Sequence, residues 1–207
     1  IKDFEQLTGL LKKKEICKRT VVVWPEEDHT QEAILQATHE GFISPILVCS
    51  ERTKKIFADR EALQAVTAEN PEEASRIAVK IIREQKADII MKGFVNTDVL
   101  LRAILDKEHG ILPRGAVLTH ITVTKIPEYP KLLFFTDAAV IPYPTEEQRK
   151  AQIKYVIDFC HAFNIDCPKI SLIHCSEKVD VKHFPYTDSY NKIKKETESG
   201  LFGKCVV

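Results

Sequence analysis

The chain has 207 residues, 44% hydrophobic and 29% charged, which is the balance of an ordinary globular protein able to bury a sizeable core. Its 30 basic and 30 acidic side chains cancel, so no net field favours a nucleic acid or an anionic membrane. No apolar run approaches the roughly 20 residues of a membrane span, and residues 1–11 lack the apolar core of a signal peptide. We therefore expect a cytoplasmic protein that binds neither nucleic acid nor membranes.

The first half of the chain alternates strands and helices. The predicted elements are, in order, a helix over 2–14, a strand over 20–24, a helix over 30–40, a strand over 46–49, a helix over 51–59, a strand over 63–68 and a helix that starts at Pro71 behind Asn70 as its cap. This alternation is typical of a parallel sheet covered by helices, in which ligands gather at the carboxyl ends of the strands.

The stretch 87–106 is the first candidate for a site. Its apolar run 88–91 is too short for a helix and predicts a buried strand, which Lys92-Gly93 ends with a charge and with the residue type that tolerates positive φ. Asn96 or Thr97 can cap the helix that follows, and apolar residues over a wide arc of that helix predict that it is mostly buried.

The amino end of this helix is predicted to bind an anion of the phosphate type. The unpaired N–H groups there lie near Lys92, Gly93, Asn96 and Thr97, which add a charge, an approachable backbone, an amide and a hydroxyl. The alternative is that Lys92 is solvated and Thr97 only caps the helix. Arg102 can reach the same anion, although its spacing to Asp106 favours an i,i+4 surface pair.

The pattern changes after residue 110. Strands over 116–125 and 132–135 are separated only by residues 126–130, which is too short for a crossover helix and predicts an antiparallel hairpin. A capping box at Thr145 opens a long helix, followed by a strand over 169–175, a helix over 187–199 and a strand from residue 204. We take this change as the boundary between a first α/β domain, 1–110, and a second, 111–207.

Three polar residues of the second domain are further candidates. His120 lies on a strand among apolar residues, where it either donates to an acyl or phosphate oxygen or is a satisfied core histidine. Asp137 ends an apolar run where a strand opens into a loop, which suits a base or an orienting carboxylate as well as an Asx-type turn. Glu177 follows the strand over 169–175, and the pair Glu177-Lys178 is either a ligand contact or a surface salt bridge.

The six cysteines are widely scattered and form no CxxC pair, which favours free thiols. A zinc site can be assembled on paper from a set of five residues, Cys160, His161, Cys167, His174 and Cys175. The first three belong to a predicted helix and its exit, however, and the last two to a predicted strand. Buried structural cysteines are the commoner case, so we predict no metal site.

Four motifs follow one another through nearly the whole chain: MKGFVNTDVLLRAILDKEHG, LTHITV, TDAAVIPYPT and SEKVD. In this order they resemble the phosphate acetyl/butyryltransferase family, and the Met-Lys-Gly start with the later Thr-His is similar to its phosphate butyryltransferase branch. The resemblance implies a two-domain α/β fold like that of isocitrate and isopropylmalate dehydrogenases, with mostly parallel, helix-covered sheets and an antiparallel hairpin in the second domain.

The resemblance also implies the reaction, which moves a short-chain acyl group, butyryl in this branch, between phosphate and coenzyme A. Coenzyme A is a substrate there, and no metal or redox cofactor is needed. The thiolate attacks the acyl phosphate carbonyl in a cleft between the domains, with Lys92 and the Gly93 to Thr97 loop holding phosphate and His120 or Asp137 assisting. The partners implied are acyl-CoA, phosphate, acyl phosphate and further copies of the chain in a homodimer or higher homo-oligomer.

Members of this family continue with a Ser-Arg motif and a nearby Asp, which this sequence lacks, and a chain without them is expected to be weakly active or inactive. The motifs leave the acyl chain length and the direction of flux open. One alternative is a non-catalytic regulatory module that binds an acyl-CoA or a phosphorylated metabolite. A dehydrogenase of the same architecture is the other, but the sequence contains no GxGxxG.

Overall fold

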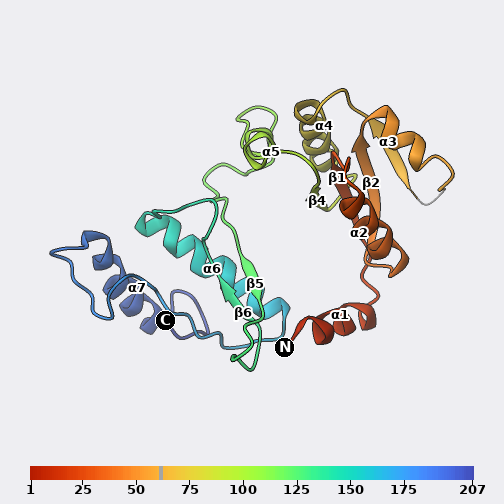
Figure 1. Cartoon of the computed structure of the whole chain (residues 1–207). Coiled ribbons are helices and arrows are strands. Elements are labelled where there is room, and N and C mark those ends of the chain that lie inside the picture. The colour runs from red at the N-terminus through yellow and green to blue at the C-terminus, as the bar shows by residue number, and fades with distance from the viewer. Residues whose placement is uncertain (61–62) are drawn as a thin grey trace. The chain divides into compact units, whose positions relative to one another are not determined.

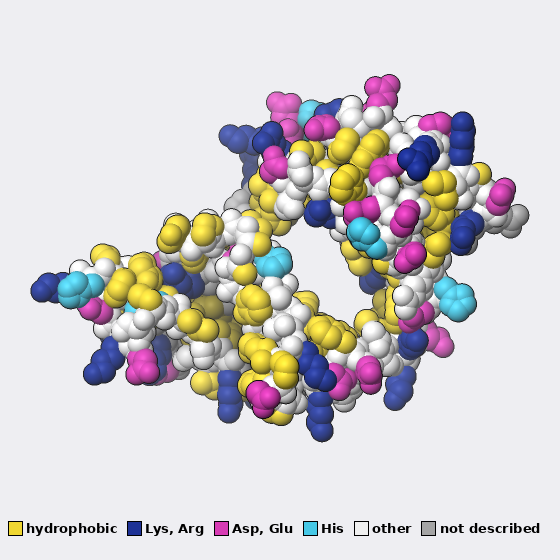
Figure 2. All heavy atoms as spheres, viewed as in Figure 1, with side chains coloured by type: hydrophobic (Ala, Val, Ile, Leu, Met, Phe, Trp, Pro, Cys, Tyr) yellow, Lys and Arg dark blue, Asp and Glu magenta, His cyan; other side chains and the backbone are white. Residues whose placement is uncertain are grey.

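The computed structural model describes residues 1–60 and 63–207. The chain divides into two compact units (Figure 1). The first, called the N-terminal unit here, is Glu5–Arg114, and the C-terminal unit is Gly115–Val207 together with Ile1–Phe4. Acidic and basic side chains are interspersed over the face seen in Figure 2, as expected for a chain with equal numbers of each. Among the described residues, no helix combines the length and the apolar character that crossing a membrane requires.

The N-terminal unit contains a sheet of four parallel strands in the order β3-β2-β1-β4. The strands are β1 (Lys18–Val23), β2 (Ile43–Cys49), β3 (Gln64–Thr67) and β4 (Ile89–Lys92). The helices are α1 (Phe4–Lys13), α2 (Asp28–His39), α3 (Glu51–Ile56), α4 (Pro71–Arg83) and α5 (Thr97–Ile104). The predicted helix-covered parallel sheet is therefore confirmed. Both neighbours of β1 run parallel to it, so the carboxyl ends of β1, β2 and β4 share one edge.

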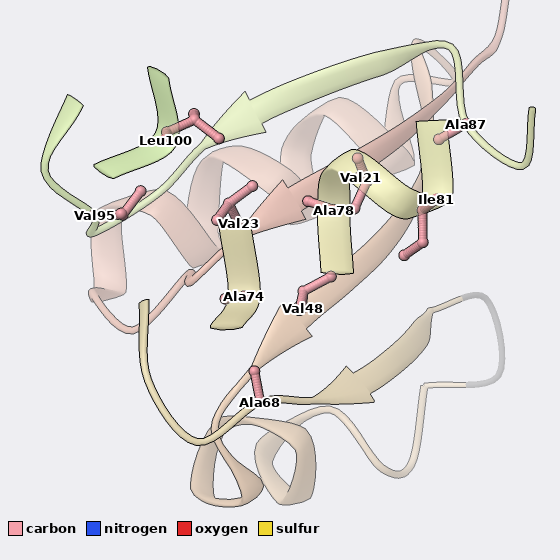
Figure 3. Close-up of a cluster of buried hydrophobic side chains, with 10 residues drawn as sticks. All are labelled: Val21, Val23, Val48, Ala68, Ala74, Ala78, Ile81, Ala87, Val95 and Leu100. Carbon is pink, nitrogen blue, oxygen red and sulfur yellow. The ribbon is translucent and has the colours of Figure 1, made fainter. Parts of the chain in front are cut away.

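Each face of this sheet packs against its own helices. On one face Val21 and Val23 contact apolar residues of α4 and α5, including Ala78 and Leu100 (Figure 3). The intervening Val22 points to the opposite face, where Ile34 of α2 and Phe57 after α3 bury it. Alternation along β1 thus divides the core into two layers, because successive side chains of a strand point to opposite faces.

Two burial predictions for the central stretch were wrong. Strand β4 lies at the edge of the sheet, and Ile89 keeps 44% of its surface exposed. Helix α5 has Leu100 as its only buried residue, whereas we predicted a mostly buried helix. An edge strand and a two-turn helix have too few neighbours to cover apolar side chains on all sides.

The C-terminal unit contains the predicted antiparallel hairpin in a short form. Its strands are β5 (Thr122–Thr124) and β6 (Leu133–Phe135), and its helices are α6 (Glu146–Ala162), the 3-10 turn η1 (Pro185–Thr187) and α7 (Asp188–Glu198). The predicted capping box is present, since Thr145 accepts from the Gln148 N–H and the Gln148 side chain accepts from the Thr145 N–H. Ile153 and Ile157 of α6 pack on Ile193 of α7.

The strands predicted over 169–175 and from residue 204 were wrong. Only an isolated parallel bridge joins Lys169 and Val206, held by hydrogen bonds from the Ile170 and Val206 N–H groups. Beyond this bridge the segment has no neighbouring strand among the described residues, and Ile173 is 84% exposed. A β-branched, apolar sequence forms a strand only where another strand supplies the ladder.

Candidate functional site

The side chain of Lys92, the last residue of β4, closes the loop that follows this strand. Its ammonium donates to the carbonyl of Gly93 at 3.2 Å and to that of Val95 at 2.8 Å, so the side chain closes the loop as a clasp. Lys92 remains exposed as a residue. The side chain therefore fixes the shape of the loop and still presents a positive charge at its surface.

Gly93 is needed for close approach and not for its dihedral angle. We predicted a residue with positive φ here, but Gly93 does not belong to the residues with positive φ. A Cβ atom at Gly93 would instead lie 2.7 Å from the carbonyl oxygens of both Val23 and Trp24. The Gly93 N–H donates to Val23 at 2.9 Å and the Phe94 N–H to Trp24 at 2.8 Å, which holds the loop against the end of β1.

The amino end of α5 has free donors. Asn96 occupies the cap position, yet its side chain makes no capping hydrogen bond. Of the hydrogen bonds within residues 1–60 and 63–207, none engages the backbone N–H of Thr97 or of Asp98. Asn96 and Thr97 are both exposed. The structure thus brings Lys92, Gly93, Asn96 and Thr97 into one loop, which combines an ammonium with unpaired amides at a helix start.

Arg102 does not pair with Asp106 as predicted. It donates to Asp98 at 2.9 Å, one turn toward the amino end of α5, and both side chains are well exposed. Asp106 instead accepts from the N–H groups of Glu108 and His109 and closes the turn after the helix. Both i±4 spacings exist in the sequence, and the observed pair is the one with the acid nearer the helix start, the more favourable orientation.

Glu26 braces the neighbouring loop, a role that was not predicted from the sequence. Its carboxylate accepts from the Ser50 N–H and hydroxyl, both at 2.8 Å, and from the Thr53 hydroxyl at 2.7 Å. This joins the ends of β1 and β2. Just before it, Trp24 has a φ of +56°, a left-handed conformation that is strained for a bulky residue. No local pattern signals a contact between residues more than 20 positions apart.

In the C-terminal unit, Asp137 organises a second cluster of polar groups. One carboxylate oxygen accepts from the Thr119 hydroxyl at 2.6 Å and from the His120 N–H at 3.0 Å. The other accepts from the N–H groups of Ala139 and Val140, both at 2.8 Å. The Asx-type turn is therefore present, and the same carboxylate also orients the segment that contains His120.

These contacts set the protonation state of Asp137. Partial burial is the largest single influence and raises its pKa, but the hydrogen bonds from Thr119, Val140, Ala139 and His120 together outweigh it. The net result is a pKa far below the ordinary value of 3.8. A carboxylate that holds its charge so firmly is a poor proton acceptor at neutral pH and a good orienting group.

His120 is half-buried and is held to the Asp137 carboxylate through its backbone N–H. Its Nδ1 atom is 3.3 Å from the Thr122 hydroxyl, which can donate or accept. Over the part of the chain that the structure describes, Nε2 has no hydrogen-bond partner. Either tautomer is compatible with this arrangement, so Nε2 can serve as a donor or as a proton acceptor.

Gln152 of α6 is a further member of the Asp137 cluster and was not predicted from the sequence. It is 4% exposed, and its amide donates to the Thr119 hydroxyl at 3.2 Å. The Thr119 hydroxyl therefore accepts from Gln152 and donates to Asp137, which connects α6 to the carboxylate. A polar side chain next to the apolar stripe of Ile153, Val156 and Ile157 is the signal that could have identified Gln152.

Glu177 lies apart from these contacts. It is exposed in the bend after residue 175, and no hydrogen bond or ion pair within the described ranges involves it. All six cysteines are free thiols. In residues 1–60 and 63–207, no group of three or more His, Cys, Asp or Glu side chains is arranged to hold a metal ion.

The comparisons with known proteins agree with the motifs. A family model described as phosphate acetyl/butaryl transferase matches residues 62–199. The phosphate butyryltransferase of Clostridium beijerinckii is 31% identical over all of this chain and 69% of its own length. The phosphate acetyltransferase of Thermotoga maritima is 27% identical over 92% of this chain and 65% of its own length. This chain thus spans about two thirds of such relatives.

The fold is shared with solved structures of the same kind. A branched-chain phosphotransacylase from Enterococcus faecalis V583 superposes with a TM-score of 0.76 at 18% identity, covering 92% of this chain and 67% of that one. A phosphotransacetylase from Streptococcus pyogenes gives 0.71 at 14% identity, covering 98% and 72%. The predicted fold class is thereby confirmed. Because the family model covers most of the chain and a relative at 31% identity aligns with all of it, this chain belongs to the phosphate acetyl/butyryltransferase family.

Proposed function

We propose that this protein moves a short-chain acyl group between coenzyme A and phosphate, and that butyryl is its preferred acyl group. Family membership supports the reaction, with acyl-CoA, phosphate and acyl phosphate as substrates. The Met-Lys-Gly start of the β4 loop and the pair Thr119-His120 support the butyryl preference. The observation that carries the proposal is the Lys92 loop, where an ammonium lies beside unpaired amides at a helix start.

In the proposed chemistry, the coenzyme A thiolate forms a C–S bond with the acyl phosphate carbonyl while the C–O bond to phosphate breaks. Lys92 and the first N–H groups of α5 hold the phosphate and stabilise the charge that it carries away. The thiol has an ordinary pKa near 8.5 and needs a proton acceptor, and the tetrahedral oxyanion needs a donor. His120 is assigned to these proton steps through Nε2, the ring nitrogen without a partner among the described residues.

Asp137 is assigned an orienting role in this proposal. Its depressed pKa removes it as a base, whereas its bonds to Thr119 and to the His120 N–H fix the segment that presents the imidazole. Arg102 is engaged by Asp98 and Glu177 lies exposed, so the assignment of either to substrate binding rests on the sequence alone. We also propose a homodimer or larger homo-oligomer, for which the mass in solution is the test.

The rates of thiol release from butyryl-CoA and acetyl-CoA, with and without phosphate, test the reaction and its preference together. We expect release to depend on phosphate and kcat/KM to be about tenfold or more higher for butyryl-CoA, since each buried methylene contributes to discrimination. A preference for acetyl-CoA would overturn the butyryl assignment alone. Release that is independent of phosphate would overturn the transferase assignment.

The phosphate role of Lys92 is tested in the same assay by Lys92→Ala. We expect the KM for phosphate to rise roughly 10- to 100-fold, because a charge-assisted contact is lost. Lys55→Ala is the matched control, since Lys55 is an exposed lysine of α3 whose side chain has no hydrogen bond or ion pair to any described residue. Lys92→Arg should recover part of the lost phosphate affinity if the positive charge is the cause. If Lys92→Arg does not lower the KM for phosphate and its melting temperature differs from that of the wild type, Lys92 serves only to close the loop.

A further inference from the structure

A pocket in the C-terminal unit shares no residue with the Lys92 loop or with the Asp137 cluster. It has a volume of about 340 Å³ and is formed where the amino ends of α6 and α7 meet. Its charged lining consists of Glu146 and Arg149 from the start of α6, and Asp188 and Lys192 from α7. Two helix starts therefore direct their positive ends toward the same space.

Arg149 is the unusual member of this lining. It is only 8% exposed, and its guanidinium lies 4.9 Å from the centre of the Tyr190 ring. It donates to the Ser189 hydroxyl at 2.7 Å and, at a long 3.5 Å, to the carbonyl of Pro144. All of these contacts are with neutral groups, and no carboxylate forms an ion pair with Arg149 anywhere in the described ranges.

The two carboxylates that line the pocket, Glu146 and Asp188, are already paired with lysines. Glu146 contacts Lys150 at 3.0 Å and Lys192 at 3.5 Å, while Asp188 contacts Lys192 at 2.8 Å. Glu196 contacts Lys150 at 2.7 Å. Arg149 is therefore the one cation of this cluster that contacts no carboxylate among the described residues, and burying a guanidinium without a directly paired anion is costly.

We propose that this pocket binds the phosphate group of a small phosphorylated metabolite, with Arg149 as its charged anchor. A guanidinium offers a planar fork of donors that matches two oxygens of a phosphate, and Arg149 uses only two of its N–H groups on neutral acceptors. The volume of the pocket is at the lower end of the range for ligand sites, which fits a small metabolite. The proposal stands independently of the Lys92 loop, because all lining residues belong to the C-terminal unit.

The test is a titration of the ¹⁵N-labelled 207-residue chain with inorganic phosphate, observed at the arginine Nε–H signals, with sodium chloride at equal ionic strength as the control. We expect a saturable shift of the Arg149 signal, assigned by its absence in Arg149→Gln. Lys92→Ala should leave the shift unchanged, which separates this site from the phosphate loop of the proposed enzyme.

Two variants test whether Arg149 and Lys192 bind the phosphate. Arg149→Gln should weaken phosphate binding at this pocket about tenfold or more, because a charge-assisted bidentate contact is lost. If that variant fails to fold, Lys192→Gln keeps Arg149 in place and removes a lysine that is half exposed; it should weaken the shift severalfold. An Arg149 signal that does not move with phosphate, or that moves equally with chloride, would overturn the proposal.

Discussion

Replacing Gly93 with alanine is expected to destabilise the protein by roughly 1–3 kcal/mol and to displace the loop that carries Lys92. The added Cβ would lie 2.7 Å from the carbonyl oxygens of Val23 and Trp24, and backbone atoms of a central strand cannot move aside. These same carbonyls accept the hydrogen bonds that hold the loop. Phosphate-dependent turnover should therefore fall with the stability, and thermal unfolding with parallel rate measurements checks both.

Gly9→Ala is the matched control for Gly93→Ala. Gly9 lies inside α1 and has no atom within 4 Å of its ideal Cβ position. Alanine there is expected to stabilise the helix by about 0.5–1 kcal/mol, since it is the better helix former. If the two variants had the same free energy of unfolding, the close approach of the β4 loop to the end of β1 would be wrong.

Replacing Asp137 with asparagine is expected to cost about 2–4 kcal/mol and to reduce turnover strongly. Each carboxylate oxygen accepts two hydrogen bonds, so an amide NH₂ in either position faces two donors. Whichever way the amide turns, two bonds are lost. The His120 segment or the 139–140 turn is then released, and denaturant unfolding together with initial rates measures the loss.

The effect of Asp137 on stability should depend on pH in a definite direction. Its pKa in the folded state lies below the ordinary value of 3.8, so the native protein binds this proton less readily than the unfolded chain. The stabilisation is therefore fully present above about pH 4–5 and decreases as the pH falls through and below the unfolded pKa. The stability difference between wild type and Asp137→Asn should shrink over the same range.

Asp158→Asn is the control for this second substitution. Asp158 is exposed on α6, and its side chain has no hydrogen bond or ion pair within residues 1–60 and 63–207. The change should alter the free energy of unfolding by less than about 0.5 kcal/mol. Equal effects at positions 137 and 158 would contradict the role assigned to the carboxylate cluster.

Local signals in the sequence predicted most of the fold. The Asn70-Pro71 start and the Thr145 capping box placed α4 and α6 correctly, because a cap is a short-range interaction between a side chain and the next turn. The alternation of strand and helix predicted the parallel sheet for a similar reason. Each element carries its own periodicity, and the short connections leave few ways to pair the strands.

The errors concern contacts that no local pattern encodes. The segment over 169–175 has the composition of a strand, yet whether it becomes one depends on a neighbour far away in the sequence. The exposure of β4 was likewise decided by its position at the sheet edge. The loop at Gly93 was predicted correctly, but the reason for the glycine was wrong. A sequence does not distinguish a glycine needed for close backbone packing from one needed for positive φ.

The candidate site was predictable in its residues and less so in their roles. The sequence identified Lys92 and Asp137 from polar positions at strand ends, and His120 from its place in a predicted strand, whereas the structure places this histidine just before β5. It did not show that Lys92 closes its own loop, or that four donors hold Asp137 in the charged form. Such roles follow from geometry. Each hydrogen bond that a carboxylate accepts lowers its pKa, and a carboxylate with a low pKa orients its neighbours and does not act as a base.

The most direct test of the central claim is ³¹P NMR with butyryl-CoA and inorganic phosphate, recorded on a version of this chain extended by the Ser-Arg segment of its family, without which weak activity is expected. Transfer to phosphate predicts that an acyl phosphate resonance grows as the inorganic phosphate signal falls, with one free thiol released per acyl phosphate formed. A heat-denatured sample is the control. Thiol release without acyl phosphate would show hydrolysis, and binding of butyryl-CoA without any change in the spectrum would show a non-catalytic module; either result would contradict the claim.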